Sequence, residues 1–336
     1  MYFSKYISNF NYDPFVITVS EKSASYKNLD EVFNNHIKDV KTYKTVTSEL
    51  VKLYSFLSTG NSKTGIPNGQ VGKNKKKNLL IFSLHTGYNH WTIPHTEEAI
   101  KIIALKTGDF NVDVTKDVGV FEKKNLSKYD VIVLNNNCSD RERRDMFWDV
   151  IKENELLEEK EVLDKAKKLE KNLLKHIKKG NGLVVLHGGI VMQNNSSDFS
   201  DMVGGSFDFH PLQQEIRVKL FDTEHPLVAS FGGKGFTHYD EPYFFKNAYF
   251  NYNFRPLLYM NLDQIKMTRD RPKDNIKFIS WIKRYGRGRV FYSSPSHNAQ
   301  SMDNPRLVNF LLNGLYYVAG ELNCDDSPIL VNKLTD

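Results

Sequence analysis

Short runs of consecutive apolar residues recur along the chain, each bounded by glycine or polar positions. The run LVVL at 183–186 is representative, with Gly182 before it and His187-Gly188-Gly189 after it. Runs that are this short and this continuous predict strands buried on both faces of a sheet. Strands are predicted on this basis at 79–84, 112–114, 129–134, 183–186, 215–220, 256–260, 277–283 and 289–294.

Other segments repeat apolar residues at three- and four-residue steps, which is the spacing of one helix face. The clearest is the highly charged segment 163–177, which ends in Lys178-Lys179-Gly180, a helix stop signal. Helices are predicted at 95–107, 163–177 and 304–319. The alternation of strands and helices predicts an α/β fold, a doubly wound and mostly parallel sheet with helices on both faces.

The same pattern divides the chain into three parts. The regular alternation begins only at Asn78, so residues 1–77 are interpreted as an N-terminal extension, with a linker rich in Gly, Asn and Lys at 60–77. Residues 78–322 form the α/β domain, and 323–336 form a C-terminal tail. No apolar run reaches the roughly 18 residues of a membrane span and the N-terminus has no signal-peptide core, so a cytoplasmic location without membrane partners is expected.

Composition and charge limit the kinds of partner that the protein is expected to have. Hydrophobic residues make up 40% of the 336 positions, enough for a sizeable core. The net charge of +6 comes from dispersed lysine runs rather than an arginine-rich stripe, so no nucleic-acid partner is expected. The two cysteines, Cys138 and Cys324, lie far apart, which argues against a disulfide scaffold or a thiolate zinc site and fits a reducing compartment.

Histidines carry the candidate chemistry. His90, His187 and His297 all follow predicted strands, and open α/β sheets bind ligands at the carboxyl ends of their strands. Imidazoles at that edge can move protons near neutral pH or bind a divalent metal such as Zn²⁺, and both possibilities stay open. The neighbouring Asp240 and Glu241 can supply a carboxylate to either role.

Familiar nucleophile and phosphate motifs are incomplete. The segment His187-Gly188-Gly189 is similar to an esterase oxyanion-hole segment, but the chain has no G-x-S-x-G elbow. The stretch GGKG at 232–235 lacks the spacing of a phosphate-binding loop, and no G-x-G-x-x-G follows the first buried strand. No nucleotide cofactor is therefore expected.

Taken in order, several segments resemble the trehalose-utilisation (ThuA-like) family. They span about residues 79–322 and are FSLHTGYNHWTIP, SKYDVIVLNNN, GNGLVVLHGGI, FSDMVGGSFDFHP, EHPLVASFGGKGF, DEPYFF, ISWIKRYGRGRVFYSSPSHN and NPRLVNFLLNGLYYVAGEL. The resemblance implies a class I glutamine amidotransferase-like fold, with a flavodoxin-like sheet, and a role in carbohydrate catabolism. Amidotransferases carry a nucleophilic cysteine at the corner where this chain, like the family, has His187, so glutamine amidotransferase activity is not expected.

The chain departs from the family pattern around the expected pocket. Trp91 follows His90 where many members have a small residue, His95 is additional, and VMQNNSSDF replaces the aromatic residues that usually follow the histidine corner. These departures indicate that the substrate can differ from that of other members.

Two functional hypotheses follow. The first is an enzyme that acts on a sugar or keto-sugar glycoside, in which the acid–base residues are His187, His90, Glu241 and Asp240. Its substrate-binding residues would be Trp91, Phe207, His210, Tyr243, His297 and Asn298, and its metal ligands would be His90, His187 and His297. The second hypothesis is a non-catalytic sugar-binding protein or partner of a sugar oxidoreductase. Convergence of the histidines and the acid pair within about 4 Å of one point favours the enzyme. A small carbohydrate is the expected partner, and homo-oligomerisation is left open.

Overall fold

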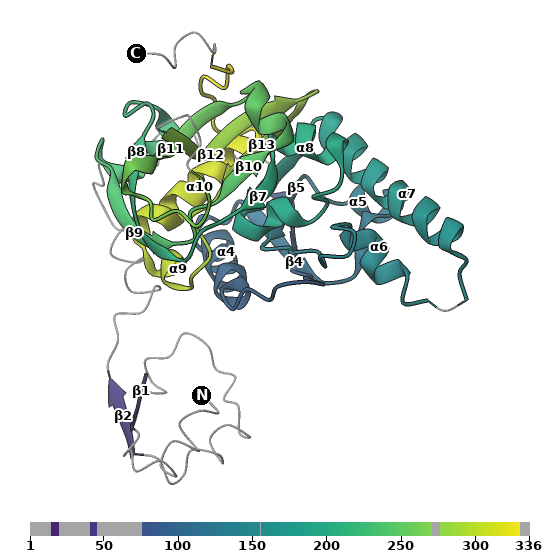
Figure 1. Cartoon of the computed structure of the whole chain (residues 1–336), viewed down its shortest axis with the longest axis horizontal. Coiled ribbons are helices and arrows are strands. Elements are labelled where there is room, and N and C mark those ends of the chain that lie inside the picture. Colours follow the sequence, from purple (N-terminus) through teal and green to yellow (C-terminus); the bar gives the residue numbers. More distant parts are fainter. Residues whose placement is uncertain (1–14, 20–40, 46–75, 155, 271–275, 330–336) are drawn as a thin grey trace. The chain divides into compact units, whose positions relative to one another are not determined.

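The computed structural model describes residues 15–19, 41–45, 76–154, 156–270 and 276–329 (Figure 1). The chain divides into two compact units, Met1–Lys63 and Thr64–Asp336. In the first unit, β1 (Phe15–Val19) and β2 (Lys41–Thr45) pair in parallel. The rest of the expected extension, and the expected linker up to residue 75, lie outside the described residues.

The second unit is built on one nine-stranded sheet with the strand order β4-β3-β5-β6-β13-β12-β11-β8-β9. Its strands are β3 (Lys77–Phe82), β4 (Phe110–Thr115), β5 (Val131–Asn135), β6 (Gly182–Leu186), β8 (Gln214–Leu220), β9 (Phe236–Asp240), β11 (Arg255–Asn261), β12 (Ile276–Tyr285) and β13 (Gly288–Ser293). A separate antiparallel pair joins β7 (Ser206–Phe209) and β10 (Phe244–Lys246).

Seven of the nine strands point in the same direction. The strands from β4 to β13 pair in parallel, and each later neighbour is antiparallel, so only β12 and β8 run against the rest. The expected mostly parallel α/β sheet is therefore confirmed. As a consequence, β3, β5, β6, β13 and β9 all end at one edge of the sheet.

Helices cover both faces of this sheet (Figure 1). On β13, Phe291 packs against Phe310 of α10 (Pro305–Ala319), whereas its neighbours Val290 and Tyr292 belong to the core shared with α7 (Glu159–Lys178). Since successive side chains of a strand face opposite ways, α10 and α7 lie on opposite faces. The remaining helices are α4 (Ile93–Thr107), α5 (Lys123–Leu126), α6 (Met146–Ile151), α8 (Ser197–Val203) and α9 (Gln300–Asp303). Short 3₁₀ segments are η2 (Val118–Phe121), η3 (His187–Val191), η4 (Pro226–Phe231), η5 (Asn247–Asn251) and η6 (Leu262–Gln264).

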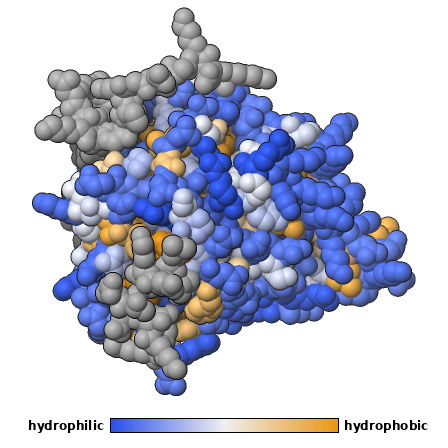
Figure 2. All heavy atoms as spheres, turned by 90° about the horizontal axis from the view of Figure 1, so that it is seen from above, coloured by the Kyte–Doolittle hydropathy of each residue, from blue (hydrophilic) through white to orange (hydrophobic). Residues whose placement is uncertain are grey.

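The continuous apolar runs are the buried strands of the sheet. Every residue of β5 and β6 is buried, and α7 buries apolar residues at the predicted three- and four-residue steps. The predicted strands and helices are confirmed. The short strands β7, β9 and β10 were not predicted. Among the described residues, no helix is long and apolar enough to span a membrane. Figure 2 shows a largely polar surface in its view, with hydrophobic side chains scattered over it.

Candidate active site

His187 occupies the corner at the end of β6, fully buried and with a positive φ of 42°. A side chain in this left-handed region is strained, and such strain persists where the surrounding structure fixes the residue. The imidazole Nδ1 lies 2.9 Å from the carbonyl oxygen of Ser294, just after β13. Because a carbonyl oxygen can only accept, Nδ1 carries the proton. In the neutral ring, Nε2 then directs a lone pair into the site.

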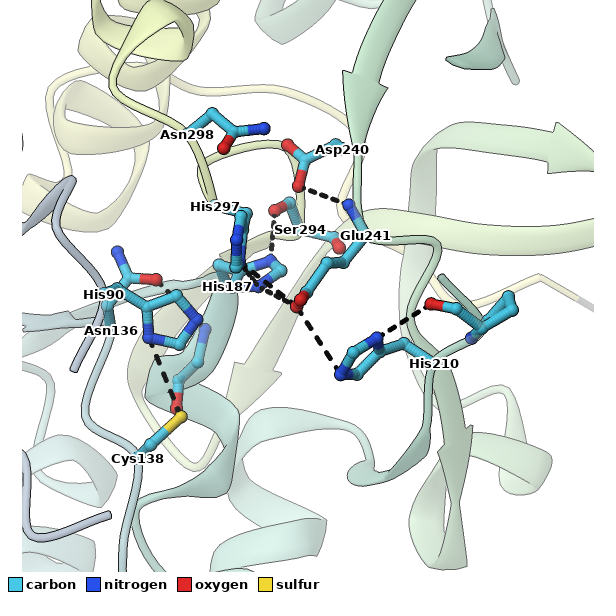
Figure 3. Close-up of polar contacts among 12 residues, drawn as sticks. His90, Asn136, Cys138, His187, His210, Asp240, Glu241, Ser294, His297 and Asn298 are labelled. Atoms are coloured by element: carbon cyan, nitrogen blue, oxygen red, sulfur yellow. Dashed lines mark hydrogen bonds and ion pairs between the residues drawn. The ribbon is translucent and has the colours of Figure 1, made fainter. Parts of the chain in front are cut away.

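Four side chains from four strand ends meet at this lone pair (Figure 3). His187 Nε2 lies 3.3 Å from Glu241 Oε2 and 3.2 Å from His297 Nδ1, and His297 Nδ1 lies 3.1 Å from the same carboxylate oxygen. The rings of His90 and His187 are 5.0 Å apart. One ligand atom from each of His90, His187, His297 and Glu241 lies within 4.8 Å of all the others. We call these four residues the histidine–glutamate cluster.

The negative charge of the buried Glu241 carboxylate favours a positive charge at the centre of the cluster. Burial raises the pKa of the Glu241 carboxyl, but hydrogen bonds and charge from His187 and His297 outweigh burial and hold that pKa well below its ordinary value. The carboxylate is therefore ionised and can only accept hydrogen bonds. With Nδ1 of His187 protonated, its Nε2 and the Glu241 carboxylate oxygen are two acceptors facing each other at 3.3 Å, and an additional proton on that ring or a bound metal cation would make this contact favourable.

His90 is kept neutral. Burial, together with the charges of His187 and His297, lowers the pKa of His90 to about 2. Its Nδ1 faces the Cys138 sulfur at 3.9 Å, and its Nε2 is buried without a hydrogen-bond partner. A buried, unpaired ring nitrogen of a neutral imidazole is a suitable metal ligand, because only the unprotonated nitrogen can coordinate.

The spacing of three members of the cluster fits a divalent metal, and the ligand atoms of all four lie within 4.8 Å of one another. Bonds of about 2.0–2.1 Å in a tetrahedral zinc site place ligand atoms about 3.3 Å apart. The three contacts among His187, His297 and Glu241 are 3.1–3.3 Å. Imidazole nitrogen with one carboxylate oxygen suits zinc and other first-row transition metals. The three histidines expected to be metal ligands thus come together, and Glu241 joins them.

Glycines allow the loops of the site to approach each other. A Cβ atom added at Gly188 would lie 2.8 Å from the Cys138 sulfur and 2.9 Å from His90 Cε1. A Cβ at Gly87 would lie 2.4 Å from the Ser139 carbonyl oxygen. Contacts this close exclude a side chain, so both positions require glycine for packing. Gly188, directly after His187, therefore makes room for His90.

Two asparagines at the end of β5, Asn135 and Asn137, hold these loops, a role that the sequence did not reveal. Asn137 donates to the carbonyl oxygens of Phe82 and Leu84, at 3.0 and 2.7 Å. Asn135 donates to the carbonyl oxygen of Ile93 at 3.0 Å, and both side chains are fully buried. Buried amides that bond to main-chain carbonyls fix the β3–α4 loop, which carries His90.

Of the two adjacent acids, only Glu241 belongs to the cluster. The Asp240 carboxylate is buried on the other side of the chain, where Oδ1 accepts from the Glu241 main-chain N–H at 2.8 Å (Figure 3). Its Oδ2 approaches His238 Nε2 at 3.0 Å. Asp240 thus lies next to the site but does not contact the three histidines of the cluster.

The residues expected to bind substrate occupy different places. Tyr243 is buried against His187 with 3.9 Å between ring centroids, and Phe207 packs on Tyr243. His210 reaches the open side of the site, with Nε2 3.7 Å from Glu241 Oε2 and a side chain 36% exposed. Asn298 instead donates to the Tyr239 carbonyl oxygen at 3.0 Å, a structural contact.

Tyr88, an exposed aromatic residue that contacts the histidine rings of the cluster, was not identified from the sequence. Trp91 is 63% exposed and takes no part in the ring contacts of the cluster. Tyr88 is 60% exposed, yet its ring lies 4.7 Å from that of His90 and is stacked at 6.1 Å on that of His297. Its position two residues before His90 was the available sequence signal.

The fold and the site together define an open α/β protein with a buried imidazole–carboxylate cluster at the strand-end edge. A family model described as trehalose utilisation (ThuA) matches residues 78–318, so the chain belongs to the ThuA family. A putative ThuA-like protein from Bacteroides uniformis has a similar structure, with a TM-score of 0.55 and 18% identity over 76% of this chain and 95% of that one. A second from Parabacteroides merdae has a TM-score of 0.50 and 18% identity over 76% and 98%. No curated protein matches the chain.

Cys138 is expected to be dispensable for chemistry despite its contact with His90. Burial raises the pKa of its thiol to about 12, so the sulfur is a neutral thiol at physiological pH rather than a nucleophilic thiolate. Cys138→Ser should keep the melting temperature within a few degrees and retain turnover. Steady-state kinetics of a folded Cys138→Ser protein test this, and complete loss of turnover would contradict the histidine-centred site.

Proposed function

We propose that the protein is an enzyme that acts on a sugar or keto-sugar glycoside by acid–base chemistry, with a divalent metal such as Zn²⁺ held by His90, His187, His297 and Glu241. The observation that carries the proposal is the meeting of one ligand atom from each of these residues within 4.8 Å of the others. A protein that only binds sugar does not need this convergence. Burial of one carboxylate among three imidazoles is costly unless the group is charge-compensated.

The roles of the residues follow from their contacts. His187 is oriented by the Ser294 carbonyl oxygen, and Glu241 is ionised. When bound, the metal would act as a Lewis acid toward a sugar carbonyl or hydroxyl. His210 is the partly exposed imidazole beside Glu241, and its Nδ1 lies 2.9 Å from the Pro211 carbonyl oxygen. The Nδ1 proton is therefore engaged, and Nε2, which faces Glu241 Oε2 at 3.7 Å, is the nitrogen that would accept a proton from substrate.

A keto-sugar suits this arrangement. A carbonyl acidifies the neighbouring C–H bond, so a base such as His210 can remove that proton. The released electron pair forms a C=C bond, the glycosidic C–O bond breaks, and the leaving oxygen takes up a proton. A metal held by the cluster would polarise the carbonyl and so favour removal of this proton. The overall change is an elimination, and it needs no oxidant or reductant.

Two features favour a carbohydrate. The family to which the chain belongs is described by trehalose utilisation. Aromatic rings flank the cluster on two sides: Tyr88 lies on the β3–α4 loop, and Phe207 lies on the other side, where it packs on the buried Tyr243. Accessible rings such as Tyr88 can pack against the apolar face of a sugar. The free thiols Cys138 and Cys324 fit action in a reducing compartment, and we propose the cytoplasm.

The proposal is tested by His187→Gln, which roughly keeps the size of the side chain but removes the imidazole Nε2 that would bind the metal. Turnover with trehalose and 3-keto-disaccharides, screened first with the native protein, should fall by about 10²-fold or more, and bound metal should fall in parallel. His176→Gln is the matched control, because the His176 ring lies outside the cluster, where its nitrogens form hydrogen bonds with the Tyr129 carbonyl oxygen and the Asn181 side chain.

The two hypotheses differ in this experiment. A His187→Gln variant that melts at a lower temperature but keeps its specific activity and its metal would make His187 structural. A native protein that binds the sugars without turning any of them over would favour the non-catalytic sugar-binding protein or oxidoreductase partner.

Tyr88 is expected to bind the sugar ring rather than hold the fold, because it is largely exposed above the cluster. Tyr88→Ala should raise KM about tenfold, as loss of about 1.4 kcal/mol of stacking would do, with bound metal unchanged. Tyr88→Phe should keep most of the affinity. Leu105→Ala, which removes another exposed apolar side chain, is the control. An unchanged KM in Tyr88→Ala would remove Tyr88 from the site.

A further inference from the structure

A second buried polar group lies directly behind the cluster. Asp240, His238 and Ser301 are 2%, 7% and 0% exposed. His238 Nε2 lies 3.0 Å from Ser301 Oγ and 3.0 Å from Asp240 Oδ2. A buried carboxylate and imidazole cost free energy unless they are bonded, so the contacts within this group stabilise it. We call these three residues the Asp–His–Ser unit.

The Asp–His–Ser unit has the residue types of a hydrolytic triad but not its geometry. In such a triad the acid bonds one imidazole nitrogen and the serine bonds the other. Here Asp240 and Ser301 both contact Nε2 of His238, and the serine is fully buried. The unit therefore cannot activate Ser301 for attack on a substrate, and a different role is required.

The unit joins two chain segments, each of which supplies one member of the cluster. Asp240 accepts from the main-chain N–H of Glu241, the next residue, at 2.8 Å. On the other segment, the Ser301 N–H donates to the carbonyl oxygen of Asn298, the residue after His297, at 3.0 Å. The hydrogen bond between His238 and Ser301 therefore connects the strand end that carries Glu241 with the loop that carries His297.

Packing alone does not hold Glu241 in place. A small cavity of about 10 Å³ lies behind it, lined in part by Asp240, Glu241 and Ser294. Packing beside Glu241 is thus incomplete, and among the described residues the only polar contact of Asp240 Oδ2 is its ion-pair contact with His238. Polar contacts therefore contribute more than close packing to the orientation of the Glu241 side chain.

We propose that the Asp–His–Ser unit positions Glu241 against His297 and thereby sets the affinity of the cluster for a divalent metal. His238, Asp240 and Ser301 are positioning residues, since none of them belongs to the cluster itself. The inference rests on the proposed metal site. Partners that orient metal ligands typically change affinity by about 10–100-fold when they are removed.

The experiment compares His238→Leu, which removes the ring nitrogens, with His238→Gln, which keeps an amide able to bond Ser301. Zn²⁺ affinity is measured by competition with a chelator, beside the melting temperature. His238→Leu should weaken Zn²⁺ binding about 10–100-fold, and His238→Gln should restore most of the affinity. His225→Leu is the matched control, because His225 is 3% exposed and bonds the Asp325 carbonyl oxygen outside both groups.

A smaller substitution tests the same unit with less risk that the variant fails to fold. Ser301→Ala removes one hydroxyl from the same unit and should weaken Zn²⁺ binding in the same direction. An unchanged affinity in folded His238→Leu or Ser301→Ala, or an equal loss in His225→Leu, would overturn the positioning role.

A metal-free crystal structure of Ser301→Ala separates this inference from the proposed function. If the unit positions Glu241, the distance from Glu241 Oε2 to His297 Nδ1, 3.1 Å here, should widen by about 1 Å or more. An unchanged distance would contradict the positioning role even if the native protein binds metal. Failure of the native protein to bind Zn²⁺ would instead contradict the proposed metal site and leave the distance test standing.

Discussion

Three polar atoms lie within 3.1–3.3 Å of one another in the interior of this protein: His187 Nε2, His297 Nδ1 and Glu241 Oε2. At low dielectric a positive charge shared among them, on a protonated ring or a bound cation, strongly stabilises this contact with the ionised carboxylate. Other residues of the site hold these three atoms in place or bring His90 beside them. The Ser294 carbonyl oxygen fixes which nitrogen of His187 is protonated, Gly188 lets His90 approach, and the asparagines at the end of β5 hold the loop that brings His90 there.

The sheet supplies the precision that such a contact needs. Because seven strands point the same way, four loops that are distant in sequence meet at one edge. His187 and Glu241 directly follow strand ends and His297 lies close to one, whereas His90 comes from the longer β3–α4 loop. The corner after β6 keeps a non-glycine residue at positive φ, a strained arrangement of the kind found at functional sites. The imidazole there directs Nε2 toward His297 and Glu241, whereas the neighbouring thiol of Cys138 is buried and neutral.

The sequence predicted the parts of the structure that have a strong local signal. Continuous apolar runs identified the central strands, and the positions of His90, His187 and His297 after strands predicted their convergence. Short strands such as β9 were missed, because at the sheet edge only alternate residues are buried. The same alternation explains why Asp240 could not be told from Glu241. Adjacent side chains at a strand end point opposite ways, and only the register decides which one enters the site. Likewise, the asparagines of NNN look like a polar turn until their backbone partners are known.

The most direct measurement is the anomalous scattering of crystals of the native protein grown with Zn²⁺, recorded on both sides of the zinc absorption edge. The account predicts one strong peak within bonding distance of His90, His187, His297 and Glu241, at ligand distances of about 2.0–2.2 Å. A cluster without an anomalous peak at saturating Zn²⁺, or zinc bound only elsewhere on the chain, would contradict a metal at the centre of this site.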